Sequence, residues 1–508
     1  MSTPLSLLQL GTRGLNTSLA REALSLQQFP LMRNWRSFKG KLETAPGVTA
    51  FSTTTLAGRP LKLFAWQQDN LLQQFLALTT TKAYRYNPVT DVFDDITGGG
   101  GYTGGTSNWW DATAFAGQAI LTNGVDAIQL DTGSGALTAL GGSPPGTAAC
   151  LATFQTYLLA GATNASLRLV RWTDTGVATV WSGGDAGNLT LFQSPGPVYR
   201  LIPLGEACIA YRPTGIHVLF YVGSPFIFAQ RQIYSTGGLI APRAVADLGP
   251  RHIYWGTDNV YLFDGANRVP IATEIFQDML DDVDPSFQSY IHAAIHWEQK
   301  EVYFFYPRTG DVGVASRAWV YNYEEQHWHQ QVLTATASGE FRRFTSVTWA
   351  AAAGTWAGYP GTWNEPDWTD PAPILLVATD TGAVRFLDTD SVNVAGAART
   401  RIAETGLIPV GAARFGQPGI KCTLQQIVVD LENKGTYNLE VWVGTQDSLT
   451  GDAGITWTQY TIISDGTVRF IDTRHTAVYF AFRLQTTGAG EAERVSGLTA
   501  YFSPRGTR

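Results

Sequence analysis

The sequence predicts an all-β protein, a β-propeller of six to eight blades with a small C-terminal β-sandwich and an N-terminal arm. Three observations lead to this fold. The 508 residues include 53 glycines and 12% aromatic residues but only 15% charged residues, a composition typical of short strands joined by tight turns. A strand pattern recurs along most of the chain and changes its rhythm after Asp390. The first 47 residues lack this rhythm.

Residues 1–47 are expected to form an arm that lies on its own body or on a neighbouring copy. Leu15, Leu19 and Ala23 are four residues apart, which favours a short amphipathic helix. So short a helix is not stable alone in water and needs a surface to dock on. Leu15 and Leu19 are therefore candidate subunit-interface residues.

Residues 48–395 are predicted to form the propeller. An apolar run that ends in a turn recurs, at first about every 40 to 50 residues, which is the length of one four-stranded blade. These runs begin at Ala83, Ala127, Leu167, His217, Val260, Ala318 and Ala383. A β-sandwich would contain similar strands but gives no reason for a recurring unit of this length, so we favour the propeller.

Two parts of this region can be assigned strand by strand. His252–Gly256 and Val260–Phe263 alternate around the turn Gly256–Asn259, a pattern that predicts a β-hairpin. One blade can be followed whole, with four strands predicted at 290–296, 302–306, 317–321 and 327–332. Four strands in meander order fit a propeller blade.

Residues 396–508 are predicted to form a separate β-sandwich of ordinary size. Well-formed strands are expected at 422–432, 437–444, 455–462, 467–471, 477–485 and 496–502. Asn433-Lys434-Gly435 and Asp465-Gly466 are the clearest turn signals between them.

Two loops of the predicted propeller are unusual. Residues 97–110 read TGGGGYTGGTSNWW, too rich in glycine to hold one conformation unaided. The second loop carries four tryptophans among Gly, Pro and Ala, namely Trp349, Trp356, Trp363 and Trp368. Tryptophan in loops stacks on sugars, buries against a partner subunit, or covers an edge of its own blade. We treat these four as candidate subunit-interface residues.

Charge and cysteine content narrow the functional classes. The net charge is −7 and the arginines are scattered, so the chain lacks the basic stripe of a sequence-reading nucleic-acid binder. Cys150, Cys208 and Cys422 lie far apart in or beside apolar runs, which favours buried thiols and folding in a reducing cytoplasm. We expect no signal peptide and no membrane insertion, because no apolar run approaches about 18 residues.

Motifs of the common enzyme classes are absent from the sequence, and we predict neither an enzyme nor a cofactor. His292/His296 and His327/His329 are spaced to share strand faces, but no Cys or carboxylate completes a zinc set at ligand spacing. No metal is therefore expected. Trp172–Gly176 and Ala378–Gly382 are faintly similar to the Asp-box turns of sialidases. The alternative function is accordingly a glycan-binding or glycan-cleaving propeller that acts in host receptor recognition.

Carboxylates cluster in one short segment that contains Asp278, Asp281, Asp282 and Asp284. The pattern fails for calcium, which needs oxygens at alternate positions around a glycine-containing loop. The segment is either a solvated acidic turn or a surface that faces a negatively charged passage. We carry these four residues forward as channel-facing candidates.

Three sequence phrases resemble tail nozzle proteins of short-tailed bacteriophages, also called packaged-DNA stabilisation or head-completion hub proteins. They are NWRSFKGKLETAPG at 34–47, STGGLIAPR at 235–243 and GTDNVYLFDG at 256–265. The layout with a C-terminal β-domain is also similar, whereas the tryptophan-rich insertion departs from it.

This resemblance implies a structural subunit of the phage virion, assembled in the host cytoplasm. It implies a homohexameric ring below the head–tail adaptor protein, in contact with a tail fibre or with a needle or plug protein. The ring would retain packaged double-stranded DNA and conduct it at ejection without sequence specificity. A weakly acidic chain suits a conduit, because each phosphate contact adds a salt-dependent attraction that slows passage.

Overall fold

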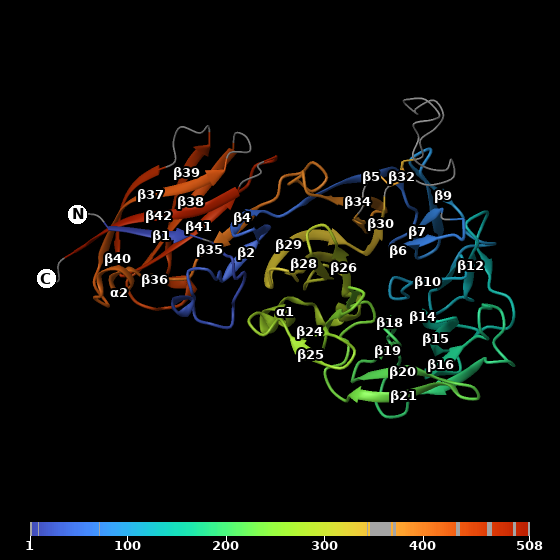
Figure 1. Ribbon diagram of the computed structural model, residues 1–508. Helices are drawn as coiled ribbons and strands as arrows, with labels where there is room; N and C mark the ends of the chain where they lie inside the picture. Colours follow the sequence, from blue (N-terminus) through green and yellow to red (C-terminus); the bar gives the residue numbers. More distant parts are fainter. Residues whose placement is uncertain are drawn as a thin grey trace, which may run out of the picture.

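Short apolar runs separated by glycine and polar turns fold here as antiparallel meanders, and these form most of the computed structural model (Figure 1). The structure describes residues 3–8, 10–70, 72–342, 344–345, 367–368, 372–432, 437–464, 470–490 and 494–505. Within them, seven four-stranded blades form a propeller beside a β-sandwich, as predicted, but the sandwich is not confined to residues 396–508, since strands from residues 3–44, expected to form an arm, pair within it.

Six blades follow one another along the chain, each with its strands paired in sequence order. Blade 1 contains β6 Pro60–Gln67, β7 Gln73–Thr79, β8 Ala83–Asn87 and β9 Val92–Asp95. Blade 2 contains β10 Asp111–Phe115, β11 Gln118–Thr122, β12 Gln129–Asp131 and β13 Thr138–Ala139. Blade 3 contains β14 Ala148–Phe154, β15 Tyr157–Thr163, β16 Ser166–Trp172 and β17 Gly187–Thr190. Blade 4 contains β18 Arg200–Leu204, β19 Ala207–Tyr211, β20 Ile216–Gly223 and β21 Ile227–Tyr234. Blade 5 contains β22 Val245–Asp247, β23 His252–Trp255, β24 Val260–Phe263 and β25 Arg268–Pro270. Blade 6 contains β26 His292–His296, β27 Glu301–Tyr306, β28 Ala315–Asn322 and β29 His327–Ala335.

The seventh blade closes the ring with a strand from the start of the chain. Its order is β30 Ala337–Phe341, β33 Ile374–Ala378, β34 Ala383–Asp388 and then β5 Gly47–Thr55, which pairs antiparallel to β34. Hydrophobic clusters fill the spaces between neighbouring blades, and the one between blades 7 and 1 includes Phe51, Phe75 and Phe341. The short pair β31 Phe344–Thr345 and β32 Asp367–Trp368 lies between β30 and β33 in the chain.

The sandwich combines strands from both ends of the chain, and Figure 1 shows the blue N-terminal strands among the red C-terminal ones. One sheet contains β1 Thr3–Leu8, β3 Trp35–Phe38, β4 Lys41–Thr44, β37 Cys422–Glu432, β40 Phe470–Ala477 and β42 Arg494–Pro504. The other contains β2 Leu31–Arg33, β35 Arg401–Glu404, β36 Ile408–Pro409, β38 Tyr437–Gln446, β39 Thr456–Ser464 and β41 Tyr479–Thr486. Phe480 and Phe502 meet between the sheets, with ring centroids 4.9 Å apart.

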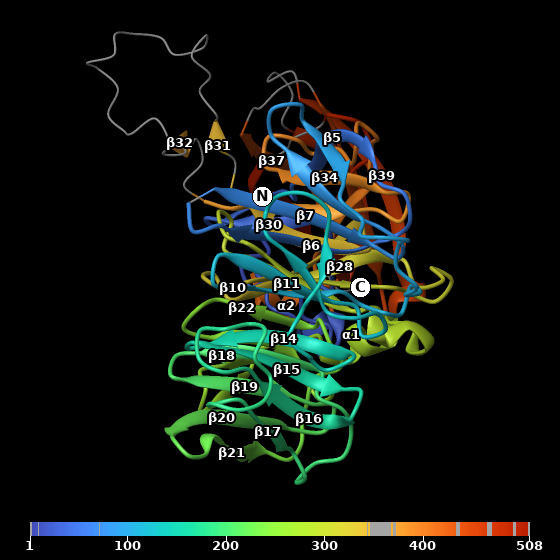
Figure 2. The same cartoon turned by 90° about the vertical axis from the view of Figure 1, so that its right-hand side faces the viewer.

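The two lobes share one sheet. β29, the outer strand of blade 6, pairs with β2 through Arg33 and Gln330, and β2 in turn pairs antiparallel to β35 of the sandwich. A single hydrophobic cluster likewise extends from Trp255 and Phe304 of the propeller to Phe480 and Phe502 of the sandwich. In Figure 2 the outer strands β20 and β21 lie at the end of the molecule farthest from β37 and β39.

The helix expected around residues 15–23 does not form. Only a short 3-10 turn, Arg21–Ala23, occurs there, because the segment is held by long-range backbone contacts instead. The amide of Leu15 donates to the carbonyl of Trp328, and Leu15 bridges to Phe29. The other helices in the described part of the chain are α1 Phe276–Asp282, α2 Val410–Phe415 and the 3-10 turns Pro285–Tyr290 and Asp452–Gly454. None within the described ranges is long and apolar enough to cross a membrane.

Candidate functional site

The first strand of each blade is its innermost, and together these strands surround an axial channel. A cavity of about 330 Å³ occupies it, lined by backbone edges and side chains of β10, β14, β18, β22, β26 and β30. Such a cavity holds water or a small molecule. It does not admit a DNA duplex, whose major groove alone is about 12 Å wide.

A buried ion pair joins three neighbouring inner strands at this channel. Arg200 of β18 contacts Asp111 of β10 at 2.5 Å, and the Asp111 side chain is 3% exposed. The other carboxylate oxygen of Asp111 accepts from the amide of Leu151 on β14 at 2.9 Å. Asp111 is therefore fully engaged, and the pair fixes the relative positions of blades 2, 3 and 4.

Two further ionisable groups near the channel have unusual acidities. Burial, together with the nearby positive charge of Arg200, lowers the pKa of Lys62 to about 8. Burial raises the pKa of Glu340 to about 7, even though the indole of Trp297 donates to its carboxylate at 2.5 Å. Both groups therefore change charge close to neutral pH, as functional groups in clefts often do.

The glycine-rich loop predicted at 97–110 closes one mouth of the channel. Arg243 from the loop before β22 donates to the carbonyl of Leu61 on β6 at 2.8 Å and lies 3.9 Å from the ring centroid of Trp109. Trp109 packs edge-on against Tyr290 at 4.6 Å, and Arg59 lies over Tyr290 at 5.3 Å. Arg243, which precedes blade 5, and Tyr290, which precedes blade 6, thus hold Trp109 of this loop in place.

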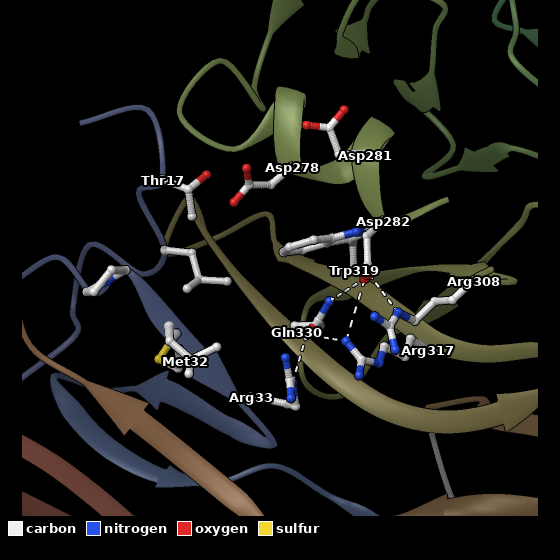
Figure 3. A pocket seen from close by; sticks show the side chains of 13 residues that line it. Thr17, Met32, Arg33, Asp278, Asp281, Asp282, Arg308, Arg317, Trp319 and Gln330 are labelled. Atoms are coloured by element: carbon white, nitrogen blue, oxygen red, sulfur yellow. Dashed lines mark hydrogen bonds and ion pairs between the residues drawn. The ribbon is translucent and has the colours of Figure 1, made fainter. Parts of the chain in front are cut away.

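A second cavity, of about 320 Å³, lies between α1, strands β28 and β29 and the N-terminal segment (Figure 3). At its floor Asp282 receives Arg308 at 2.6 Å, the hydroxyl of Tyr306 at 2.5 Å and the amide of Gln330 at 3.1 Å. Arg33 of β2 donates to Gln330 at 3.0 Å. The network fastens α1 to blade 6 and to the strand that leads into the sandwich.

The four predicted channel-facing carboxylates divide into two pairs. Asp278 and Asp281 are exposed at the lip of this second cavity. Asp282 is neutralised by its partners, and Asp284 accepts from the amide of Ser286 and caps a 3-10 turn. None of the four lines the axial cavity. Asp278 and Asp281 are still predicted to face a passage formed between several copies. Asp282 and Asp284 instead stabilise the local structure.

The predicted subunit-interface residues differ in their exposure to solvent. Leu15 is 4% exposed and packs inside its own subunit, whereas Leu19 is 47% exposed. Trp349, Trp356 and Trp363 lie outside the described residues. Trp368 belongs to β32, whose backbone pairs with Phe344. Leu19 thus remains an accessible interface candidate, and the tryptophans remain predictions.

The histidines considered for zinc are buried in blade 6, where His292 stacks on Phe305 and His327 shares a hydrogen bond with the carbonyl of Ser37. Across the described part of the chain, no group of three His, Cys, Asp or Glu side chains is placed to hold a metal ion. The three cysteines are buried free thiols, which confirms the sequence interpretation.

Sequence reasoning missed Lys62, Arg200, Arg243 and Glu340. One signal was available, since each is a charged residue in or beside a short strand that begins a blade. The first strand of every propeller blade faces the axis, so a charge there points to the channel.

Comparisons with known proteins give only distant structural similarities. No family model matches the chain, and neither does any curated protein. Solved structures that align with it include the extracellular domain of a hybrid two-component system from B. thetaiotaomicron, at 10% identity and a TM-score of 0.40, over 81% of this chain and 47% of that one. The chain therefore spans about half the length of that structure.

Two other structures align with the chain. One is Kluyveromyces lactis Hsv2, at 12% identity and a TM-score of 0.30, over 51% of this chain and 81% of that one. The other is described as a 6-phosphogluconolactonase from Bacteroides uniformis, at 12% identity and a TM-score of 0.38, over 59% and 84%. At these values the similarities carry no argument about activity.

Proposed function

We propose that this protein is a structural subunit of a phage tail nozzle, a ring that retains packaged DNA and conducts it at ejection. The proposal begins from the resemblance of residues 34–47, 235–243 and 256–265 to that family. Those phrases fall on β3 and β4, on the segment that enters blade 5, and on the β23–β24 hairpin. They therefore lie where the propeller meets the sandwich and in blade 5.

The observation that carries the proposal is the sheet shared between the lobes. β29, β2 and β35 make the propeller and the sandwich one continuous β-structure instead of two domains on a flexible linker. A wall element that bears internal pressure needs such a joint, whereas inter-domain motion is the usual expectation for separate domains.

The axial channel of a single subunit is too narrow for DNA, so the proposed passage lies between copies. Identical subunits that bind head to tail close into a ring when the rotation between them closes. We expect six copies. Among the exposed residues, we assign Leu19 to contacts between subunits and Asp278 and Asp281 to the lumen of the ring. The head–tail adaptor above and a fibre or plug protein below are the expected partners, and the virion is the expected location.

Electron microscopy of the purified full chain tests this function. We expect rings with an axial hole wider than a DNA duplex, and mass spectrometry of purified virions should detect the protein in every particle. A strictly monomeric chain that is absent from particles would contradict the proposal.

One observation favours the alternative of a glycan-binding or glycan-cleaving propeller. Trp297 and Glu340 together line a cavity of about 620 Å³, and an indole beside a carboxyl group of near-neutral pKa suits sugar recognition and acid catalysis. Glycan-array binding that is lost in Trp297→Ala but kept in Trp66→Phe would support this function over the nozzle.

A further inference from the structure

A fourth cavity lies at the mouth of the propeller axis, beside the closing loop, and neither the proposed conduit nor the shared sheet uses it. Its volume is about 290 Å³. Its walls are mainly apolar and aromatic, with Trp109, Leu167 and Tyr199 among them, and Arg200, Arg243 and Asp111 supply its charges. Apolar pockets with a few convergent polar groups are the usual form of small-ligand sites.

The charge at this mouth is not balanced. Asp111 is the carboxylate in the lining, and it is already engaged by Arg200 and by backbone amides. Arg243 has no carboxylate partner among the described residues, and its buried Nε lacks any hydrogen-bond partner there. One guanidinium group therefore faces the cavity with hydrogen-bonding capacity to spare, and buried donors of this kind are normally satisfied.

The shifted pKa values of the cationic groups around this cavity also indicate an excess of positive charge. Burial and the neighbouring charges of Arg59 and Arg200 lower the pKa of Arg243 to about 9. Burial and the charges of Arg200 and Arg243 also act on Lys62, whose pKa falls to about 8. Cations that disfavour one another in this way create a positive potential, which an anion would relieve.

The geometry points to a binding site for a small organic anion, a carboxylate carried on an apolar body. The carboxylate is recognised by the guanidinium group of Arg243, for which a bidentate contact is the preferred geometry. The apolar body packs against Trp109 and the rim residues Leu167 and Tyr199. A bare inorganic anion would satisfy the charge but leave the apolar wall unused.

Ligand-observed NMR on the full chain tests this site with three probes: benzoate, the neutral analogue benzyl alcohol, and inorganic phosphate. We expect benzoate to bind with a Kd of about 1 mM or tighter, and benzyl alcohol and phosphate to bind at least about tenfold more weakly. Equal binding of benzyl alcohol would overturn the proposal, as would binding of phosphate alone or no saturation by benzoate up to about 10 mM.

Two variants locate the binding. Arg243→Gln removes the charge, and Ala149→Phe fills the cavity from an exposed position in its lining. Each should weaken benzoate at least about tenfold, whereas Arg231→Gln, on the exposed outer strand of blade 4, should leave its Kd unchanged. Because Arg243 also donates a hydrogen bond to the carbonyl of Leu61, Arg243→Gln could destabilise the fold. In that case Ala149→Phe alone tests whether benzoate binds in this cavity. Undiminished binding in Ala149→Phe would overturn the assignment to this cavity.

Discussion

Arg36 is the residue through which buried charges join the two lobes. It contacts Glu43 at 2.6 Å and Glu301 at 3.2 Å, and Glu43 in turn receives Arg494 at 2.8 Å. Glu301 belongs to blade 6, whereas the other three residues lie on sandwich strands. Buried ion pairs contribute little over an apolar replacement of the whole set, but loss of one partner is costly.

We therefore expect Arg36→Met to lower the free energy of unfolding by about 3 to 5 kcal/mol, because the buried carboxylate of Glu301 loses its counter-charge, whereas Glu43 keeps Arg494. Chemical denaturation of the full chain measures the loss. The exposed pair Lys82–Asp95, at 2.6 Å, provides the control, since Lys82→Met should cost far less stability than Arg36→Met. Equal losses in the two variants would contradict the role of Arg36.

Glu340 predicts a pH dependence of stability. Its pKa in the folded protein is about 7, against an ordinary 4.5, because burial and, to a smaller extent, Asp247 disfavour its charged form. The bond from Trp297 and the charges of Lys62 and Arg342 oppose this rise without cancelling it. Between these two pH values the folded state binds more protons than the unfolded state, so the free energy of unfolding falls as pH rises.

Glu340→Gln should remove this dependence. We expect the variant to be more stable than the parent by about 1 to 3 kcal/mol at pH 8, with the gain shrinking as pH falls and vanishing below about pH 4. Denaturation curves at several pH values measure it. Glu298→Gln, at an exposed position that lines the same cavity, is the matched control. A gain that is as large at about pH 4 as at pH 8 would show that the effect is not protonation of Glu340.

At the scale of elements, strand β5 decides whether the propeller closes. Phe51 of β5 is 4% exposed and packs against Phe341 of blade 7 at 5.7 Å and Tyr86 of blade 1 at 4.8 Å. We expect Phe51→Ala to cost about 3 to 5 kcal/mol, whereas Thr53→Ala, at an exposed position of the same strand, should cost less than about 0.5 kcal/mol.

Hydrogen exchange locates the effect of Phe51→Ala. Faster exchange should appear in blades 7 and 1 and not in blade 4, because the closing strand contacts only its neighbours. Exchange that rises uniformly in all blades would mean that the ring opens as a single cooperative unit.

Local pattern was sufficient for elements whose partners are close in sequence. The strand predicted at 422–432 is β37, and the blade predicted from residue 290 corresponds to β26 through β29. The hairpin His252–Phe263 also forms, with Trp255 paired to Val260. In each case the alternation and the turn lie within one continuous segment, so both strands and their register follow from it.

Local sequence pattern could not predict which strands pair when they lie far apart in the sequence. β1 pairs with β42, so that Leu5 lies opposite Ala500, and Arg33 meets Gln330 at the joint of the lobes. The apolar spacing of Leu15, Leu19 and Ala23 fits a helix locally, but Leu15 is drawn onto blade 6 by contacts more than 300 residues away. The charged cluster at the axial mouth was missed for the same reason, since Lys62, Arg200 and Arg243 come together only when the blades close.

For the whole molecule, the conduit proposal predicts weak contact with DNA. A net charge of −7 per chain and exposed carboxylates at Asp278 and Asp281 should keep binding of duplex DNA weaker than about 10 μM at about 150 mM salt. Because each phosphate neutralised steepens the dependence of log K on log salt by about 0.9, we also expect a shallow slope. Fluorescence anisotropy over a salt series measures both quantities on the assembled protein.

The double variant Asp278→Lys/Asp281→Lys tests whether this surface faces the lumen. If it does, a ring of copies places new cations around the duplex, so affinity should rise at least about tenfold and the slope should steepen by about 2 or more. The control Asp69→Lys/Glu206→Lys changes the net charge equally at exposed positions on blades 1 and 4, away from α1. A rise of the same size in both double variants would reflect net charge alone and would remove Asp278 and Asp281 from the passage.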